Sequence, residues 1–320
     1  MLFNIHSWFS LFLMFLFIAS VTCTSFSEEM EIGDYRRVAV YLGVIGCEGE
    51  GELEFKEPRG LFVDSDGNLY VADSGNSRVQ VISPDSEFIT FIGEFGLEGG
   101  KFFYPVDVCV DENMAVYVLD SDKGLVYKFG SKGDYQGYIG GENAEMGELK
   151  RPLGVAVGRS GELVVADTER HRVRIYDRMS GTYTTIGGFG ESPGSFNRPS
   201  DCFVSASGYL YVVDTGNSRI CRYTQNNALK DTYGDRGAGI LSSPISIAVN
   251  REGLVCVADS SMNKIIIFKE GFIPILTIDG EKAGGFNFPT GIAISDDGHL
   301  YISDTYNNRV VHYRVVSPPY

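Results

Sequence analysis

Apolar and polar positions follow one another along most of the chain in a unit that recurs six times. Each unit opens at a proline, continues through a short apolar run and a polar turn such as Asp66-Gly67, and closes a second apolar run at an aspartate. That aspartate lies fifteen positions after the proline in every copy, and successive prolines are 47, 47, 47, 45 and 45 residues apart. The prolines are Pro58, Pro105, Pro152, Pro199, Pro244 and Pro289. Self-similarity with this period predicts a propeller or a solenoid.

Each unit contains four predicted strands. The first, such as residues 61–63, is apolar at consecutive positions, which indicates an inner strand buried on both faces. The polar dipeptide is typical of a hairpin turn, and the second strand ends at the aspartate. A third strand follows a loop of five or six residues, and a more variable fourth leads into a glycine-rich link. Six units of four strands predict an all-β fold, a six-bladed β-propeller.

The last unit ends with its third strand, residues 309–316, and has no fourth of its own. Residues 37–46 (RVAVYLGVIG) read as a strand and are similar to segments that end other units, such as residues 88–93. We therefore expect this N-terminal strand to complete the last blade and close the ring, because an unpaired sheet edge invites association. The predicted propeller spans residues 37–316, and residues 317–320 form a tail.

The N-terminus predicts export. Residues 1–23 contain no Asp, Glu, Lys or Arg, their apolar core covers residues 9–19, and small residues precede a cleavage point after Cys23. This apolar core is too short to span a membrane comfortably. Residues 24–36 read as a short polar leader. We expect a secreted or extracytoplasmic protein; a lipid anchor at Cys23 is the alternative, disfavoured because the three residues before Cys23 make a poor lipobox.

Charge and cysteine content narrow the function classes. The formal net charge of −15 repels phosphate backbones, so we expect no nucleic-acid partner, and we expect a monomer. Five cysteines follow residue 23, an odd number, and no pair has CxxC spacing. We interpret Cys109, Cys202 and Cys256 as buried small hydrophobic residues.

Three units share a motif after the closing aspartate: Asp73-Ser-Gly-Asn-Ser-Arg78, Asp214-Thr-Gly-Asn-Ser-Arg219 and Asp304-Thr-Tyr-Asn-Asn-Arg309. These motifs resemble the NHL repeat family, and the resemblance covers nearly all the chain after residue 36. The third and fifth units depart mildly, and the second departs most, with Leu125 where arginine is expected. The resemblance implies a six-bladed propeller and says little about activity, because one fold hosts many functions.

The recurring Asp and Arg positions have a structural interpretation. An aspartate at a strand end can accept hydrogen bonds from its own loop, and an arginine five residues later can pair with it. A role needed in every blade is a blade-building role. The positions concerned are Asp73, Asp120, Asp167, Asp214, Asp259 and Asp304, with Arg78, Arg172, Arg219 and Arg309.

The sequence favours binding over catalysis. Exported propellers similar to NHL proteins include a zinc-dependent amidating lyase with a metal in the central channel, which would require several matching histidines. Here His171, His299 and His312 fall at different levels of different strands, and no GxSxG motif is present. An extracytoplasmic lyase or hydrolase with a channel metal remains the alternative. RNA binding, as in the NHL propellers of translational repressors, is disfavoured by charge and export.

Two variable positions at the start of the inner strands indicate a site. They carry Asp107 and Asp201 two residues after the proline, and Tyr104, Arg151 and Arg198 just before it. Because inner strands surround the axis, we expect these residues and Arg59 to ring the channel mouth and bind a protein, peptide or glycan. Ordinary polar surface is the competing interpretation.

The two aspartates leave a further choice open. Asp107 and Asp201 could share a Ca²⁺ ion, or Arg151 and Arg198 could neutralise them without a metal. We favour the arginine pairing, because two carboxylates are few for a tight calcium site. No other cofactor is expected.

Overall fold

The structure, a computed structural model, describes residues 37–141, 148–234, 240–269 and 271–317. The predicted signal at 1–23 and the leader at 24–36 lie outside the described residues. Within those residues, no helix has the length and apolar character that a membrane crossing requires.

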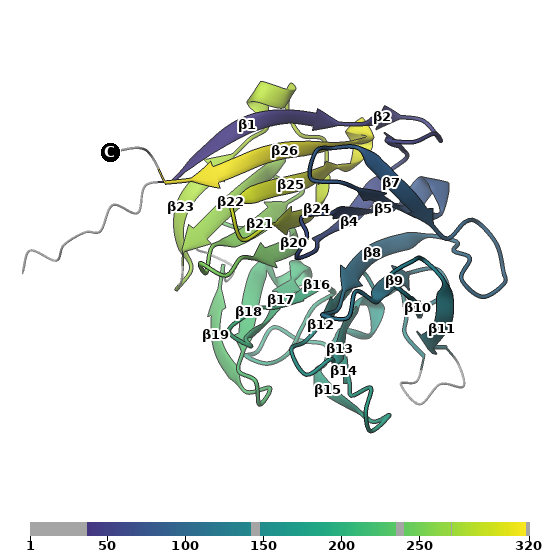
Figure 1. Cartoon of the computed structure of the whole chain (residues 1–320). Helices are drawn as coiled ribbons and strands as arrows, with labels where there is room; N and C mark the ends of the chain where they lie inside the picture. Colours follow the sequence, from purple (N-terminus) through teal and green to yellow (C-terminus); the bar gives the residue numbers. More distant parts are fainter. Residues whose placement is uncertain (1–36, 142–147, 235–239, 270, 318–320) are drawn as a thin grey trace, which may run out of the picture. The chain divides into compact units, whose positions relative to one another are not determined.

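Six four-stranded antiparallel sheets form the blades of a propeller, as predicted (Figure 1). Blades 1 and 2 consist of β4 (Pro58–Val63), β5 (Leu69–Asp73), β6 (Arg78–Ile82), β7 (Phe88–Ile92), β8 (Pro105–Val110), β9 (Val116–Asp120), β10 (Leu125–Phe129) and β11 (Tyr135–Gly140). Blades 3 and 4 consist of β12 (Gly154–Val157), β13 (Leu163–Asp167), β14 (Arg172–Tyr176), β15 (Tyr183–Gly187), β16 (Pro199–Val204), β17 (Leu210–Asp214), β18 (Arg219–Tyr223) and β19 (Leu229–Tyr233). Blades 5 and 6 consist of β20 (Pro244–Val249), β21 (Val255–Asp259), β22 (Lys264–Lys269), β23 (Ile273–Ile278), β24 (Pro289–Ile294), β25 (His299–Asp304), β26 (Arg309–Val316) and β1 (Val38–Ile45). A short parallel pair, β2 (Cys47–Glu48) and β3 (Glu54–Phe55), links blade 6 to blade 1.

The predicted ring closure is confirmed. Strand β1 pairs antiparallel with β26, from Val38 opposite Val316 to Ile45 opposite Val310, with a bulge between Tyr41 and Gly43. Figure 1 shows this pairing where the purple start of the described chain lies beside its yellow end. The N-terminal strand thus supplies the outer edge of the last blade.

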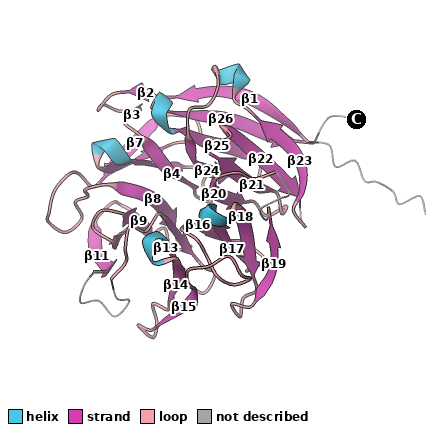
Figure 2. Cartoon of the chain, turned by 180° about the vertical axis from the view of Figure 1, so that it is seen from behind, coloured by secondary structure: helices cyan, strands magenta, loops and turns pink. Residues whose placement is uncertain are grey.

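The inner strands surround a central axis. Each of β4, β8, β12, β16, β20 and β24 contacts the inner strands of both neighbouring blades, and β24 returns to β4. The view from behind shows the blades around the axis, with a few short 3₁₀ turns as the only helical segments among the described residues (Figure 2). Because all inner strands begin at one end of the axis, residues at their starts share one face, and residues at their ends share the other.

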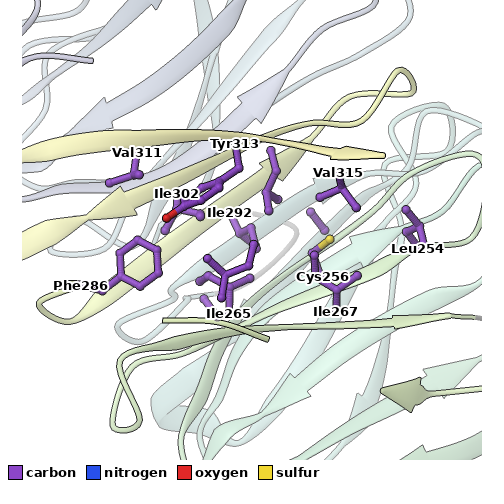
Figure 3. Close-up of a cluster of buried hydrophobic side chains, with 14 residues drawn as sticks. Leu254, Cys256, Ile265, Ile267, Phe286, Ile292, Ile302, Val311, Tyr313 and Val315 are labelled. Atoms are coloured by element: carbon purple, nitrogen blue, oxygen red, sulfur yellow. The ribbon is translucent and has the colours of Figure 1, made fainter. Parts of the chain in front are cut away.

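The core lies between adjacent blades. Figure 3 shows the cluster between blades 5 and 6, where Cys256 and Ile265 of one sheet face Ile302 and Val311 of the next. Phe286, three residues before a repeat proline, closes this layer, and the equivalent residues of the other blades are also buried. Phe102, the residue equivalent to Phe286 in blade 2, packs directly against Gly93 of a glycine-rich link. A Cβ at Gly93 would lie 2.2 Å from the Phe102 ring. Face-to-face apolar packing therefore joins each blade to its neighbour.

The closing aspartates tie each blade together at the end of its second strand. Asp214 has no exposed surface, and its carboxylate accepts hydrogen bonds from the Asn197 backbone N–H at 2.7 Å and from Arg219 Nε at 2.8 Å. Asp73 and Asp304 make the same two kinds of bond. Each bond set fixes the start of the inner strand to the loop that follows the second strand.

Candidate functional site

Three hollows lie in series along the axis and share residues at their boundaries. The mouth cavity, of about 440 Å³, is at the start of the inner strands. A neck of about 40 Å³ follows. Three residues line both the mouth cavity and the neck: Arg59, Val106 and Leu153. The neck in turn shares Asp107, Asp201 and Ser246 with a chamber of about 320 Å³. The central channel therefore has two ends of different chemistry, separated by a pair of aspartates.

Four of the predicted site residues line the mouth cavity: Arg59, Tyr104, Arg151 and Arg198. Arg59 Nε donates to the Tyr104 hydroxyl at 2.9 Å, and that hydroxyl donates to Glu57 Oε2 at 2.7 Å. Burial raises the pKa of Tyr104 to about 12, so the hydroxyl stays protonated. This chain of hydrogen bonds fixes Arg59 between blades 1 and 2.

Arg151 and Arg198 are more exposed than Arg59. Arg151 Nε lies 3.9 Å from Glu169 Oε1, a carboxylate that also has Lys150 Nζ at 3.5 Å. The backbone N–H of Arg198 donates to His171 Nδ1 of blade 3 at 3.0 Å. An exposed guanidinium group, such as that of Arg198, or one with only a distant carboxylate partner, such as that of Arg151, can turn toward an incoming anion.

Both arginines have a left-handed backbone, with φ of 43° at Arg151 and 54° at Arg198. This region is unfavourable for residues other than glycine. Glu57 and Phe288 occupy the same position in blades 1 and 6 and share the conformation, and side chains of the preceding blades bond their N–H groups. The conformation is therefore shared by the junctions that open blades 1, 3, 4 and 6, and the two arginines at the mouth have it as well.

Asp107 and Asp201 lie deeper than predicted, in the neck, where they line no part of the mouth cavity. Asp107 accepts from the Val108 N–H at 2.9 Å and from the Val155 N–H of blade 3 at 2.7 Å. Asp201 accepts from Cys202 at 2.7 Å and from Ile247 of blade 5 at 2.9 Å. In the part of the chain that the structure describes, no ion pair joins either carboxylate to Arg151 or Arg198. The favoured arginine pairing is therefore wrong, because both carboxylates lie in the neck, which neither Arg151 nor Arg198 lines.

Glycines in the adjacent blades make room for the two aspartates. A Cβ at Gly60 would lie 2.2 Å from Asp107 Oδ1, and one at Gly154 would lie 2.7 Å from Asp201 Oδ1. Glycine and aspartate thus alternate over blades 1 to 4 because each aspartate side chain crosses the space that its neighbour leaves open.

Burial raises the pKa of Asp107 well above its ordinary value, and the charge of Asp201 adds to this. Burial likewise raises the pKa of Asp201 to about 7. The two groups titrate as a pair, so the neck retains a proton near neutral pH.

This pair makes stability depend on pH. A carboxyl whose pKa is higher in the folded protein than in the unfolded chain stabilises the fold at low pH, and this contribution is lost as pH rises toward the folded pKa. We expect Asp201→Asn to remove part of that loss. Between about pH 5 and pH 7, the free energy of unfolding of the variant relative to wild type should rise with pH, as measured by urea denaturation. A constant difference across this range would contradict the shared-proton description of the neck.

His299 and His312 lie on different strands and at different levels, as expected, but their side chains are in contact, which was not expected. Strand pairing places Tyr301 opposite His312 and His299 opposite Arg314, so the two histidines are diagonal neighbours on one face of blade 6. His299 Nδ1 lies 2.8 Å from His312 Nε2, and burial lowers the pKa of His312 to about 4. Neither lines the three hollows. Among the described residues, no group of three or more His, Cys, Asp or Glu side chains is placed to hold a metal ion.

The chamber was missed by sequence reasoning. Phe62 of blade 1 and Phe203 of blade 4 line it, at a repeat position where blades 3, 5 and 6 have alanine. That contrast of large and small residues was the available signal. Cys109 and Cys202 also line the chamber and, like Cys256, are buried free thiols, whereas Cys47 is an exposed one.

A match to a repeat family and a likeness to solved structures both support the fold. The NHL repeat pattern matches residues 55–82, 149–176 and 286–313, which belong to blades 1, 3 and 6. Among curated proteins, no sequence matches the chain.

Several solved structures are similar. A streptogramin B lyase has 12% identity and a TM-score of 0.61 over 88% of this chain and 98% of its own. Virginiamycin B lyase from Staphylococcus aureus has 12% identity and a TM-score of 0.58 over 88% and 100%. An auxiliary nutrient binding protein from Bacteroides thetaiotaomicron has 16% identity and a TM-score of 0.65 over 88% and 78%. These identities support the shared fold alone. The chain is therefore a six-bladed β-propeller in which three stretches match the NHL repeat.

Proposed function

We propose that this protein is an exported binding scaffold that takes an acidic protein, peptide or glycan at the mouth of its central channel. The observation that carries the proposal is the charge of the mouth cavity. Its charged lining residues are three arginines, Arg59, Arg151 and Arg198, and one aspartate, Asp122, in a protein with a net charge of −15. A local positive site in an acidic molecule attracts an anionic group and rejects most other surfaces.

The mouth residues divide the recognition between them. Arg151 and Arg198 are exposed, and the carboxylate nearest to Arg151 Nε is 3.9 Å away, so both guanidinium groups can form two-point hydrogen bonds with a carboxylate or sulfate. Arg59 is held by Tyr104, with Glu57 Oε2 4.0 Å from its Nη2, and so presents a preordered guanidinium group, which reduces the entropy lost on binding. The mouth therefore combines a fixed cation with two adaptable ones.

The experiment compares acidic and neutral probes on an array of glycans and peptides. We expect uronate-containing or sulfated glycans or acidic peptides to bind, and Arg151→Gln/Arg198→Gln to weaken binding about tenfold or more. The matched control is Arg251→Gln/Arg314→Gln, because neither residue lines the mouth cavity and the charge change is the same. Equal loss in both double variants would show only an effect of net charge and would overturn the proposal.

A metal-dependent lyase or hydrolase is the second candidate, because two similar structures are lyases and the neck holds two carboxylates. Asp107 and Asp201 would be the ligands of a Ca²⁺ ion there. Their fit is poor, since each carboxylate already accepts two backbone N–H groups and the pair offers few further oxygens. Calcium calorimetry distinguishes the candidates: tight one-to-one binding that is lost in Asp107→Asn/Asp201→Asn would favour the metal-dependent enzyme.

A further inference from the structure

The chamber is a second cavity at the opposite end of the channel from the mouth. Its walls include the last residues of the inner strands, such as Val63 and Val204, and its rim includes turn residues that follow them, such as Ser65 and Ala206. The mouth is formed by residues at the strand starts. At about 320 Å³ the chamber is within the size range of small-molecule sites.

The walls of the chamber suit a compact apolar body. Phe62 and Phe203 come from blades 1 and 4, which lie across the ring from each other, and both side chains are only half-buried. Ala156, Ala248 and Ala293 occupy the equivalent position in three other blades of the lining, where their small side chains take up little of the chamber. An apolar group between the two rings would remove their exposed faces from water.

Acidic residues outnumber basic ones in the lining of the chamber. Its charged lining residues are five carboxylates, those of Asp64, Asp107, Glu112, Asp201 and Asp296, and one guanidinium, that of Arg251. Arg251 Nε lies 3.1 Å from Asp296 Oδ2, so the only cation is already paired within the lining. Asp107 and Asp201 form the inner end of the chamber, where it meets the neck.

We propose that this chamber binds a small organic cation, a primary amine whose apolar body lies between Phe62 and Phe203 and whose ammonium group meets Asp107 and Asp201. Two buried carboxylates that repel each other are stabilised in their ionised form by a cation between them, because a buried charge needs a nearby opposite charge. A bare metal ion fits less well, since the chamber walls near the pair are valine, isoleucine, alanine and cysteine side chains, which are poor oxygen-ligand donors. The proposal is independent of the mouth, because none of the mouth arginines lines the chamber.

Binding of the amine is coupled to protons. The groups that face the pair are the two carboxylates themselves, the Ser246 hydroxyl, and the buried thiols of Cys109 and Cys202. Because the pair retains a proton near neutral pH, an ammonium group displaces that proton to solvent when it binds. Amine affinity should therefore rise with pH through the range in which Asp201 titrates.

Calorimetry on the full propeller tests this with phenethylamine, cyclohexylmethylamine and adamantylamine as probes and phenylethyl alcohol as the neutral counterpart of the first. We expect at least one amine to bind at millimolar concentration or below, with affinity about tenfold higher at pH 8 than at pH 6. The neutral alcohol should bind at least about tenfold more weakly than phenethylamine, and proton release should appear as a dependence on buffer ionisation enthalpy.

Variants separate the chamber from the mouth. Asp107→Asn/Asp201→Asn should abolish amine binding, and Phe62→Trp, which enlarges a half-buried wall residue and keeps both carboxylates, should weaken it at least fivefold. Phe62→Trp serves as the test if the double variant does not fold. Arg151→Gln/Arg198→Gln should leave amine affinity unchanged. Failure of all three amines to bind, or equal binding of amine and alcohol, overturns the proposal without affecting the mouth.

Discussion

Deletion of residues 24–46 is expected to lower the free energy of unfolding by several kcal/mol or to cause aggregation, because it removes β1 and exposes the whole edge of β26. The strand also contributes packing, since Ala39 and Tyr41 lie against the core between blades 5 and 6 and the Tyr41 ring stands 5.5 Å from Tyr313. Thermal melting and size-exclusion chromatography measure the two effects.

The matched control deletes only residues 24–34, which leaves every described residue in place. This shorter deletion should change neither the melting temperature nor the elution volume. A variant lacking residues 24–46 that melts at the wild-type temperature and elutes as a monomer would show that ring closure does not depend on β1.

Replacement of Asp214 by alanine is expected to destabilise the protein by about 3–5 kcal/mol, because it leaves a buried guanidinium without its carboxylate. The side chains of Asp214 and Arg219 are 0% and 4% exposed, and the Asn197 N–H and Asn217 amide also lose their acceptor. Urea denaturation measures the change. Since the role is structural, the correctly folded fraction should bind acidic probes at the mouth as tightly as wild type does.

The control for this change is Glu98→Ala. The Glu98 side chain is 84% exposed and forms an ion pair with Lys101. Its effect should stay within about 0.5 kcal/mol. If Asp214→Ala were as mild as the control, the bonds at the strand end would contribute little. If it kept full stability but lost the ligand, the aspartate would have a binding role that the blade-building interpretation denies.

The architecture was predictable because it follows from periodicity. The unbroken fifteen-residue interval from proline to aspartate fixes the position of two strands in every blade, and the missing fourth strand of the last unit identifies residues 37–46 as its replacement. The repeat interval and the missing strand can be read from the sequence by counting residues, and neither requires knowledge of which side chains are in contact.

The candidate site was predictable only in part. Arg151 and Arg198 line the mouth cavity, a position that follows from the start of an inner strand, whereas their role in binding stays a prediction. The partners of Asp107 and Asp201 were not predictable, since they depend on where the N–H groups of the next blade point and on the space that Gly60 and Gly154 leave. The contact between His299 and His312 could have been found from strand register, because a one-residue change of register decides which side chains share a face.

The most direct measurement is a crystal structure of the protein with the acidic ligand that binds most tightly on the array. We expect ligand density in the mouth cavity, with an anionic group within hydrogen-bond distance of the Arg151 and Arg198 guanidinium groups and close to Arg59. Density at the outer edges of the blades, or in the mouth without an arginine contact, would contradict this expectation.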